Sequence, residues 1–348
     1  MLKFKKIALL LVFSLVFALH VKADETRFVK DSDGNDIKIP LHVNKVAPLI
    51  GAFGQMTAML GYTDKMVATV QKFPDMFYVV FPQINKSNPN AMLSSNVETL
   101  ILSGAQVVYG PTSFFFNEAQ TMQLNAANIS VVNIGSFSTI DEMKTSLTMI
   151  ADILGEDAPK KAKEFNEYYD NNIKKVAERT KDLKNRPKVM SLNFSGGNYA
   201  TVNDTDIGAV YIGIAGGKNV AGDFRKEGSG MMIVVSSEQI LLWNPDIIIT
   251  SGHSSKDQIL QDKALSSINA VKNGKVYVVP TGVYLWSVRS AEGALQPLWL
   301  AKQIHPELFT DIDMEYELKN FYEKFYSYKL SNEQAKTILD GRTGTMMR

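Results

Sequence analysis

Hydrophobic and polar positions divide the chain into short buried strands that alternate with amphipathic helices. Short apolar runs bounded by turn residues predict strands that are buried on both faces, as in a parallel sheet between helices. A hairpin signal at residues 32–35 precedes these runs, and two helical patterns between 291 and 339 close the chain. The pattern predicts an α/β fold. The predicted strands are 46–50, 66–70, 107–109, 131–134, 188–192, 247–250 and 276–279.

One helical pattern is longer and more charged than the others. Between Pro159 and Leu183 the less polar residues recur every three or four positions, which fits a single helix of roughly 37 Å. An ordinary surface helix is the alternative, but its length and its place midway along the chain indicate a rigid connector. We therefore expect an amino-terminal lobe over residues 24–157, a connecting helix over 158–185 and a carboxy-terminal lobe over 186–348.

A pattern that begins at Glu98 recurs at Glu238. Each copy consists of an acidic residue, an apolar helical stripe, a break and a buried strand. A further strand follows each copy, at 131–134 and at 276–279. One such match arises easily by chance, but the shared order favours two equivalent βα lobes, each with a mostly parallel sheet and with a ligand cleft between them.

The first 23 residues have the features of a secretory signal peptide. Lys3, Lys5 and Lys6 precede an apolar run at 7–19, and the small residue Ala23 follows it. A membrane anchor is the alternative, but 13 residues fall short of the about 20 that a bilayer requires. We expect cleavage after Ala23.

The composition limits the cellular compartments and the binding partners that are possible for the chain. The chain has no cysteine, which excludes disulfides, thiolate metal sites and the lipid-bearing cysteine of a lipoprotein. Removal of residues 1–23 lowers the net charge from +1 to −3, so neither nucleic acid nor an anionic membrane surface is an expected partner. We expect a monomeric protein of the periplasm.

Motifs of the common enzyme classes are missing. The sequence contains no GxxxxGK[ST], no GxSxG and no HExxH, and no GxGxxG opens a helix. After the signal peptide only His42, His253 and His305 remain, too few and too scattered for a cage around a bare metal ion. A bare-metal binding protein and an exported enzyme with catalytic groups from distant loops remain alternatives.

Aromatic and thioether side chains are concentrated in the loops that follow the predicted strands. Open α/β sheets bind ligands at the carboxyl ends of their strands. Apolar side chains in hydrated loops are unfavourable unless a ligand or other protein atoms bury them. Each could pack under its own loop, but together they indicate a cleft for a large, partly apolar ligand. The candidate contacts are Phe53, Lys72, Phe73, Phe77, Tyr78, Phe114, Phe115, Tyr199, Met232, His253, Tyr284, Trp286 and Arg289.

Two of these candidates carry distinct chemistry. Arg289 lies three residues after Trp286, and a guanidinium beside aromatic faces can bind an anionic chelate through two hydrogen bonds. His253 is a candidate ligand for a metal that its chelator leaves partly open, and a hydrogen bond within its own loop is the alternative.

Three segments resemble a known family, the helical-backbone periplasmic binding proteins for ferric siderophores, cobalamin and haem. Residues 58–68 (AMLGYTDKMVA) are similar to its LG…D.VVG segment, and residues 238–248 (EQILLWNPDII) are similar to its E…L…NPDVII segment. Residues 280–289 (PTGVYLWSVR), followed by 298–309, look like its carboxy-terminal signature. The resemblance covers nearly all of the chain after residue 23.

The resemblance implies a binding protein without enzymatic activity or cofactor. Such a protein captures a metal chelate and delivers it to an inner-membrane ABC permease with a cytoplasmic ATPase. It also implies one exposed docking glutamate in each lobe, at Glu98 and Glu238, where compensation of a helix amino terminus is the structural alternative. By family frequency the expected ligand is a ferric siderophore. The scarcity of basic residues in the loops favours less charged ligands: a hydroxamate siderophore, cobalamin, or a small nickel or cobalt chelate.

Overall fold

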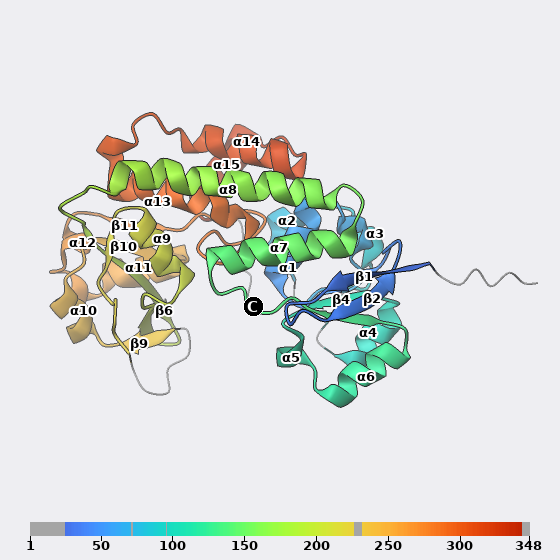
Figure 1. Cartoon of the computed structure of the whole chain (residues 1–348). Helices are drawn as coiled ribbons and strands as arrows, with labels where there is room; N and C mark the ends of the chain where they lie inside the picture. The colour runs from blue at the N-terminus through green and yellow to red at the C-terminus, as the bar shows by residue number, and fades with distance from the viewer. Residues whose placement is uncertain (1–24, 71, 95, 226–231, 343–348) are drawn as a thin grey trace, which may run out of the picture.

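The computed structural model describes residues 25–70, 72–94, 96–225 and 232–342. The predicted signal peptide lies outside these ranges. Among the described residues, no helix combines the length and the apolar character needed to cross a bilayer. The chain forms two lobes side by side, with one long helix above both of them (Figure 1).

The amino-terminal lobe is built on a three-stranded parallel sheet. Its order is β3-β4-β5, with β3 (Val46–Pro48), β4 (Val107–Gly110) and β5 (Ser130–Asn133) in register from Val46 opposite Val107. Strand β4 is buried along its whole length, as its apolar sequence predicts. The helices of this lobe are α1 (Gly51–Met59), η1 (Thr63–Lys65), α2 (Asp75–Val80), α3 (Ile84–Ser87), α4 (Val97–Ser103), α5 (Thr112–Phe115), α6 (Glu118–Ala126) and α7 (Ile140–Leu154).

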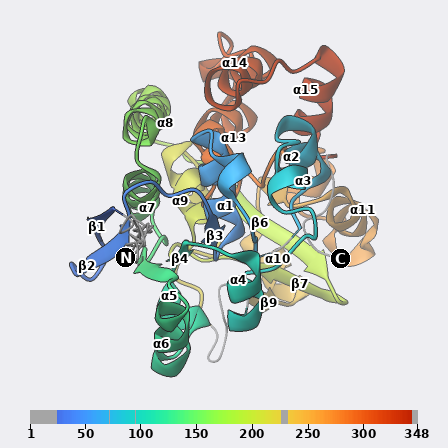
Figure 2. The same ribbon diagram turned by 90° about the vertical axis from the view of Figure 1, so that its right-hand side faces the viewer.

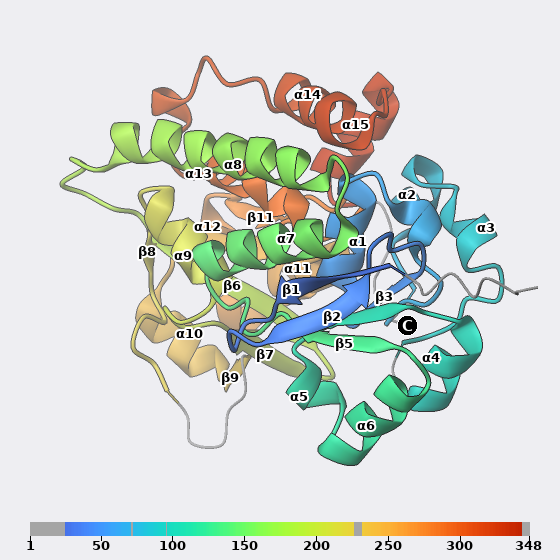
Figure 3. The ribbon, with the colours of Figure 1, turned by 45° about the vertical axis from the view of Figure 1, so that its right-hand side comes forward.

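The predicted hairpin is present, but the strand predicted at 66–70 is wrong. Strands β1 (Thr26–Lys30) and β2 (Asp36–Pro40) pair antiparallel and lie beside β5 (Figure 3). In the segment 66–70, Met66 forms a single bridge with Val46 and Thr69 a single bridge with Leu93. Because the segment pairs with two different partners in turn, no continuous ladder forms.

The carboxy-terminal lobe has a larger, mixed sheet. Strands β11-β10-β6 are parallel, and β6-β7-β9 continue antiparallel, an extension that the sequence did not predict. The strands are β6 (Lys188–Ser195), β7 (Asn198–Thr201), β8 (Lys218–Asn219), β9 (Ile233–Val235), β10 (Ile247–Thr250) and β11 (Val276–Val278). The helices before the final segment are α9 (Ile207–Ile214), α10 (Ser237–Trp243), α11 (His253–Gln261), η2 (Lys263–Leu265) and α12 (Asn269–Lys272).

The long helix α8 (Ala158–Thr180) lies between the two lobes in sequence and packs on both. Its buried stripe includes Phe165, Tyr169 and Val176, as its amphipathic pattern predicts. It ends three residues before the predicted end at Leu183. The hydrogen bond from Asn172 Nδ2 to the carbonyl oxygen of Ala294, at 2.8 Å, fastens it to the carboxy-terminal lobe.

The final segment holds three α-helices where two helical patterns were predicted. The elements are η3 (Ala291–Leu295), α13 (Gln296–Ile304), η4 (Pro306–Leu308), α14 (Met314–Tyr326) and α15 (Asn332–Leu339). Three helices form because η4 separates α13 from α14 and a non-helical segment at 327–331 separates α14 from α15. Figure 2 shows α14 and α15 together at the top of the molecule. Helix α14 contacts α1 of the amino-terminal lobe. There the Tyr326 hydroxyl accepts a hydrogen bond from Gln55 at 2.8 Å, and its ring lies 5.2 Å from that of Phe81. One hydrophobic core therefore runs through both lobes.

Candidate functional site at the lobe junction

Arg289 connects the two lobes at the carboxyl ends of their strands. Its Nε donates to the carbonyl oxygen of Ser138 at 3.1 Å, in the loop after β5. Its Nη2 lies 3.8 Å from Oδ2 of Asp206, the residue that caps α9. The arginine side chain is only 14% exposed. We use the term lobe junction for the place defined by Arg289, Ser138 and Asp206.

The loop that carries Arg289 is fixed by a buried carboxylate. Both oxygens of Glu292 accept backbone N–H groups, from Val283 at 3.2 Å and from Tyr284 at 2.8 Å. The Tyr322 hydroxyl donates to Glu292 as well. Burial raises the pKa of Glu292 to about 7, against the opposite effect of these three hydrogen bonds. Gly282 is required beside it, because a Cβ there would lie 2.4 Å from Glu292 Oε1.

Polar side chains line the carboxyl ends of β6 and β10 next to this loop. The side-chain oxygen of Asn193 accepts hydrogen bonds from Thr250 Oγ1 at 3.2 Å and from both N and Oγ of Ser251, at 2.8 and 2.7 Å. These three residues and Ser287 line a cavity of about 30 Å³. Its hydroxyl and amide groups can bind a small polar ligand, but the cavity does not hold a large chelate.

Phe114 is the most exposed of the predicted aromatic contacts. It lies in α5, directly after the carboxyl end of β4, and 81% of its surface is exposed. Its ring packs edge to face against Phe115, with 5.3 Å between the centroids. Met232, in the other lobe, is also exposed. These side chains offer apolar surface on both lobes.

Several predicted ligand contacts belong to the hydrophobic core, and for these the structure does not agree with the prediction. Phe73 and Phe77 stack at 3.8 Å between ring centroids. Each of the six side chains is covered by packing neighbours, so none offers a face to a ligand in this conformation. The residues concerned are Phe53, Phe73, Phe77, Tyr199, Tyr284 and Trp286.

Lys72 and Tyr78 lie together, but away from the lobe junction. They line a cavity of about 510 Å³ with Asn85, Asn88 and other residues of the amino-terminal lobe. None of these residues lines the cavity at β6 and β10. The Lys72 ammonium group is exposed and 4.0 Å from Asp75. Lys72 and Arg289, which were both predicted to contact the ligand, therefore lie at two separate sites.

His253 contacts the end of α15. It is the first residue of α11, and its Nε2 lies 2.6 Å from the carbonyl oxygen of Asp340 at the end of α15. Within the part of the chain that the structure describes, no three His, Cys, Asp or Glu side chains gather to hold a metal ion. The contact of His253 differs from the predicted alternative of a hydrogen bond within its own loop, because Asp340 is 87 residues away along the chain.

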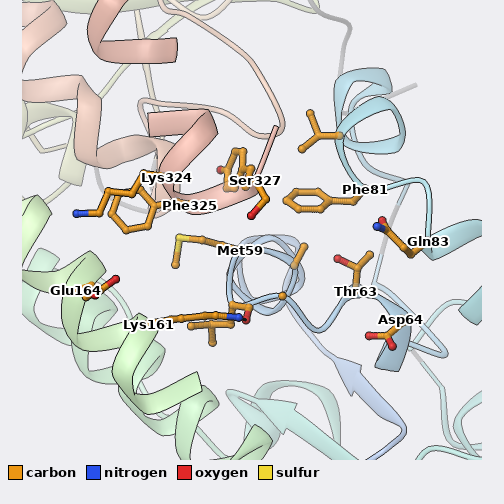
Figure 4. A pocket seen from close by; sticks show the side chains of 15 residues that line it. Met59, Thr63, Asp64, Phe81, Gln83, Lys161, Glu164, Lys324, Phe325 and Ser327 are labelled. Atoms are coloured by element: carbon orange, nitrogen blue, oxygen red, sulfur yellow. Dashed lines mark hydrogen bonds between the residues drawn. The ribbon is translucent and has the colours of Figure 1, made fainter. Parts of the chain in front are cut away.

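Another cavity, of about 520 Å³, is lined by residues of both lobes and of α8 (Figure 4). It is enclosed by the end of α1, by α8 and by α14, and its walls include Met59, Phe81 and Tyr326. Helix α1 begins at the carboxyl end of β3, so the nine residues of this helix place the cavity roughly 13 Å from that edge. Two acidic residues and two lysines line it, so its charges select for neither anions nor cations; they are Asp64, Glu164, Lys161 and Lys324.

Glu98 and Glu238 occupy equivalent exposed positions in the two lobes. Glu98 lies in the first turn of α4 and Glu238 in the first turn of α10. The helix α4 leads into β4, and α10 leads into β10, the middle strand of the parallel set β11-β10-β6. The pKa of Glu238 is lowered by hydrogen bonds from its own backbone N–H and from the Ser236 hydroxyl. The two acids therefore belong to the same step of a repeated βα unit.

A sequence model of one family, described as periplasmic binding protein, matches residues 47–282, more than half of the chain. The chain belongs to this family. The resemblance found in its three sequence segments is confirmed. Members of the family are solute-binding proteins, so this protein binds a solute and is not an enzyme.

Curated and solved relatives cover both lobes. The molybdate-binding protein MolA of Haemophilus influenzae is 26% identical, over 94% of this chain and 99% of its own length. A periplasmic solute-binding protein of Veillonella parvula has a TM-score of 0.75 at 25% identity, over 92% of this chain and 98% of its own. The structure of CeuE from Helicobacter pylori with Ni(II) has a TM-score of 0.67 at 23% identity, over 90% and 99%. These structures share the two-lobed α/β fold.

Asp206 and Ser138 are the members of the lobe junction that the sequence did not assign to a ligand site. Asp206 carries a visible signal, because an aspartate before an apolar run predicts a helix cap. Its side chain does accept the Gly208 N–H at 2.8 Å. That Ser138 lies close to Arg289 could not be predicted from the local sequence, because 151 residues separate the two.

Proposed function

We propose that the protein captures a small anionic metal species at the lobe junction and delivers it to an ABC permease. The placement of Arg289 carries this proposal. Its guanidinium is mostly buried, and its nearest carboxylate is 3.8 Å away, beyond the distance of a strong charge-assisted hydrogen bond. A shielded guanidinium with this loose pairing attracts an anion that enters between the lobes.

The neighbouring side chains favour a compact oxyanion. Asn193, Thr250, Ser251 and Ser287 line a small cavity together with apolar residues of α9 and β10. The Thr250 and Ser251 hydroxyls donate to Asn193 Oδ1, so they would have to turn from this oxygen to donate to a tetrahedral anion, beside the Asn193 amide N–H and the Ser287 hydroxyl. MolA, which matches this chain along almost its full length, is described as a molybdate-binding protein. A metal oxyanion of the molybdate type is therefore the first candidate ligand.

A metal chelate is the second candidate, and Phe114 favours it. A phenyl ring with 81% exposure gains from contact with an apolar ligand surface. A ferric siderophore, a nickel or cobalt chelate and cobalamin all present such surface. A ligand of this kind would gain apolar contacts from exposed side chains such as Phe114 and Met232 and an ionic contact from Arg289.

Calorimetric titration of the purified protein distinguishes the candidates. We expect molybdate to bind and sulfate to bind more weakly, with ferric hydroxamate siderophore, nickel-histidine and cobalamin as the chelate probes. Replacing Arg289 by glutamine removes charge-assisted hydrogen bonds worth about 1.5–3 kcal/mol, so affinity should fall at least about tenfold. The control is Lys72→Gln, which removes a cation from the other cavity. Unchanged affinity in Arg289→Gln would disprove this binding site.

Delivery requires export and docking. We propose that residues 1–23 direct the chain to the periplasm and are then removed, and that Glu98 and Glu238 bind basic residues of the permease. Mass spectrometry of the mature protein tests the first point, with Asp24 expected as the first residue. For the second, the double variant Glu98→Ala and Glu238→Ala should lose uptake but retain ligand binding. Normal uptake would contradict the docking role.

A further inference from the structure

The helices α4 and α10 correspond residue by residue. Each has seven residues and begins after a side-chain cap, Asn96 or Ser236, that accepts the N–H group three residues later. Each ends at a residue in the left-handed conformation, Gly104 with φ 67° and Asn244 with φ 44°. The two helices therefore present corresponding residues in the same orientation relative to their strands.

The apolar residues of α4 and α10 also show the same pattern of burial and exposure. Leu100 and Ile240 are fully buried, whereas the residues two positions later, Leu102 and Leu242, are 76% and 78% exposed. Within the described residues these are the two most exposed leucines. Single exposed leucines are common and need no explanation. Their recurrence at the same position of both lobes indicates a shared role.

Each leucine shares a helix face with one of the two glutamates. Leu102 follows Glu98 by four residues, and Leu242 follows Glu238 by four. Residues four apart lie one helical turn apart on the same face, about 6 Å from each other. Both helices are at the lower side of the lobes in Figure 1, on the side opposite α8. The protein therefore presents two copies of one surface element, an acid with an apolar neighbour.

We propose that Leu102 and Leu242 are paired apolar anchors for a partner with two equivalent binding surfaces. The partner of that kind is a twofold-symmetric membrane permease, each half of which offers an apolar socket one helical turn from a basic residue. This inference rests on the proposed import function and extends it to the energetics of docking. Glutamates steer and orient the complex, whereas the leucines supply its dehydrated contacts.

Charge argues against a second copy of this chain as the occupant. Neither α4 nor α10 contains a basic residue, so self-association through these helices would bury the glutamates without an opposite charge, which is unfavourable. A twofold-symmetric partner with a basic residue beside an apolar pocket in each half would pair with the glutamate and the leucine of both lobes. A partner with a single binding surface would leave one leucine exposed in the complex.

Site-specific crosslinking tests the symmetry directly. Since the chain has no cysteine, Leu102→Cys and Leu242→Cys each provide a unique thiol for a benzophenone maleimide. The labelled protein is illuminated with inner-membrane vesicles of the producing organism. We expect both positions to form adducts with the same multi-span polypeptide, and the doubly labelled protein to link two copies of it. The control is Tyr316→Cys on α14, which is also well exposed, at 63%, but lies on the side of α8.

Adducts with two different polypeptides, or with a second copy of this chain, would overturn the proposal. Thiols at Thr99→Cys and Gln239→Cys, which are next to the two docking glutamates, separate the proposal from the import function. If those positions crosslink to a permease and the leucine positions do not, the anchors are refuted and import stands. If no position crosslinks to a membrane protein, both fail.

A binding measurement gives the size of the effect. The variant with Leu102→Ser and Leu242→Ser should fold normally and bind ligand with unchanged affinity. Its affinity for the vesicles should fall by about tenfold for each leucine, the usual result of losing a well-packed apolar contact. Unchanged vesicle affinity would contradict the proposal even if crosslinks form.

Discussion

Replacing Glu292 by glutamine should remove a specific dependence of stability on pH. The carboxyl group is fully buried, and its pKa is raised to about 7 from an ordinary value near 4.5. Since the folded state binds the proton more tightly, the stabilisation is complete below pH 4.5 and is lost as pH rises through 7. A shift of this size corresponds to about 3.4 kcal/mol in total, of which roughly 2.5 kcal/mol falls between pH 5 and pH 8.

The Glu292→Gln side chain has nearly the same shape as glutamate but does not titrate. Its amide nitrogen cannot accept the N–H of Val283 or Tyr284, and one unmet buried donor costs about 1–3 kcal/mol. The variant should therefore be less stable than the parent protein at pH 5 by about that amount. The difference should shrink, and can reverse, by pH 8, because only the parent protein then holds a buried charge.

Urea unfolding monitored by circular dichroism at several pH values between 5 and 8 measures this effect. Other titrating groups are common to both proteins, so they cancel in the difference between their free energies of unfolding. The exposed Glu118→Gln on α6 is the control, and its difference from the parent should stay constant. Parallel curves for the parent protein and Glu292→Gln would show that burial does not shift the pKa as argued.

Other substitutions test the packing around these elements, each by urea unfolding. Gly282→Ala should destabilise the protein by about 1–3 kcal/mol, because the added methyl group would overlap Glu292 and Tyr322; a neutral effect would mean that the loop shifts easily. Thr139→Ala removes the capping box of α7 and should cost about 1 kcal/mol. Leu100→Ala should cost about 2–5 kcal/mol and Leu102→Ala less than about 0.5 kcal/mol, since only the first side chain is buried; equal losses would refute the proposed exposure.

The elements that could be predicted from the sequence are those with strong local signals. Strands β4 and β10 are short apolar runs that a parallel sheet buries on both faces. Helix α7 begins at a threonine cap and ends at Gly155, as its sequence predicts. The antiparallel strands β7 and β9 were missed because their sequences, NYAT and IVV, are too short for a periodic pattern.

The candidate site was harder to predict, because its residues meet through long-range contacts. Aromatic residues in loops have the same sequence signal whether they cover the core or contact a ligand. Phe77 and Phe114 both lie in loop-rich segments, yet the first is fully buried and the second is largely exposed. Arg289 was predicted from its aromatic neighbours, but its contacts with Ser138 and Asp206 depend on how the two lobes are placed.

Two helices, α8 and α14, fix the position of one lobe relative to the other. Helix α8 is the connection that the sequence predicts, and α14 adds a second through the Gln55–Tyr326 hydrogen bond and the Phe81–Tyr326 ring contact. Gln55 also accepts the Ala291 N–H at 3.0 Å, so the loop of Arg289 is fastened to the same point. A large rotation of the lobes would break these buried contacts together, each at the cost of an unmet polar group or lost packing. Ligand capture at Arg289 is therefore expected to proceed by small local movements of the loops, with Leu102 and Leu242 held at a nearly constant separation for the permease.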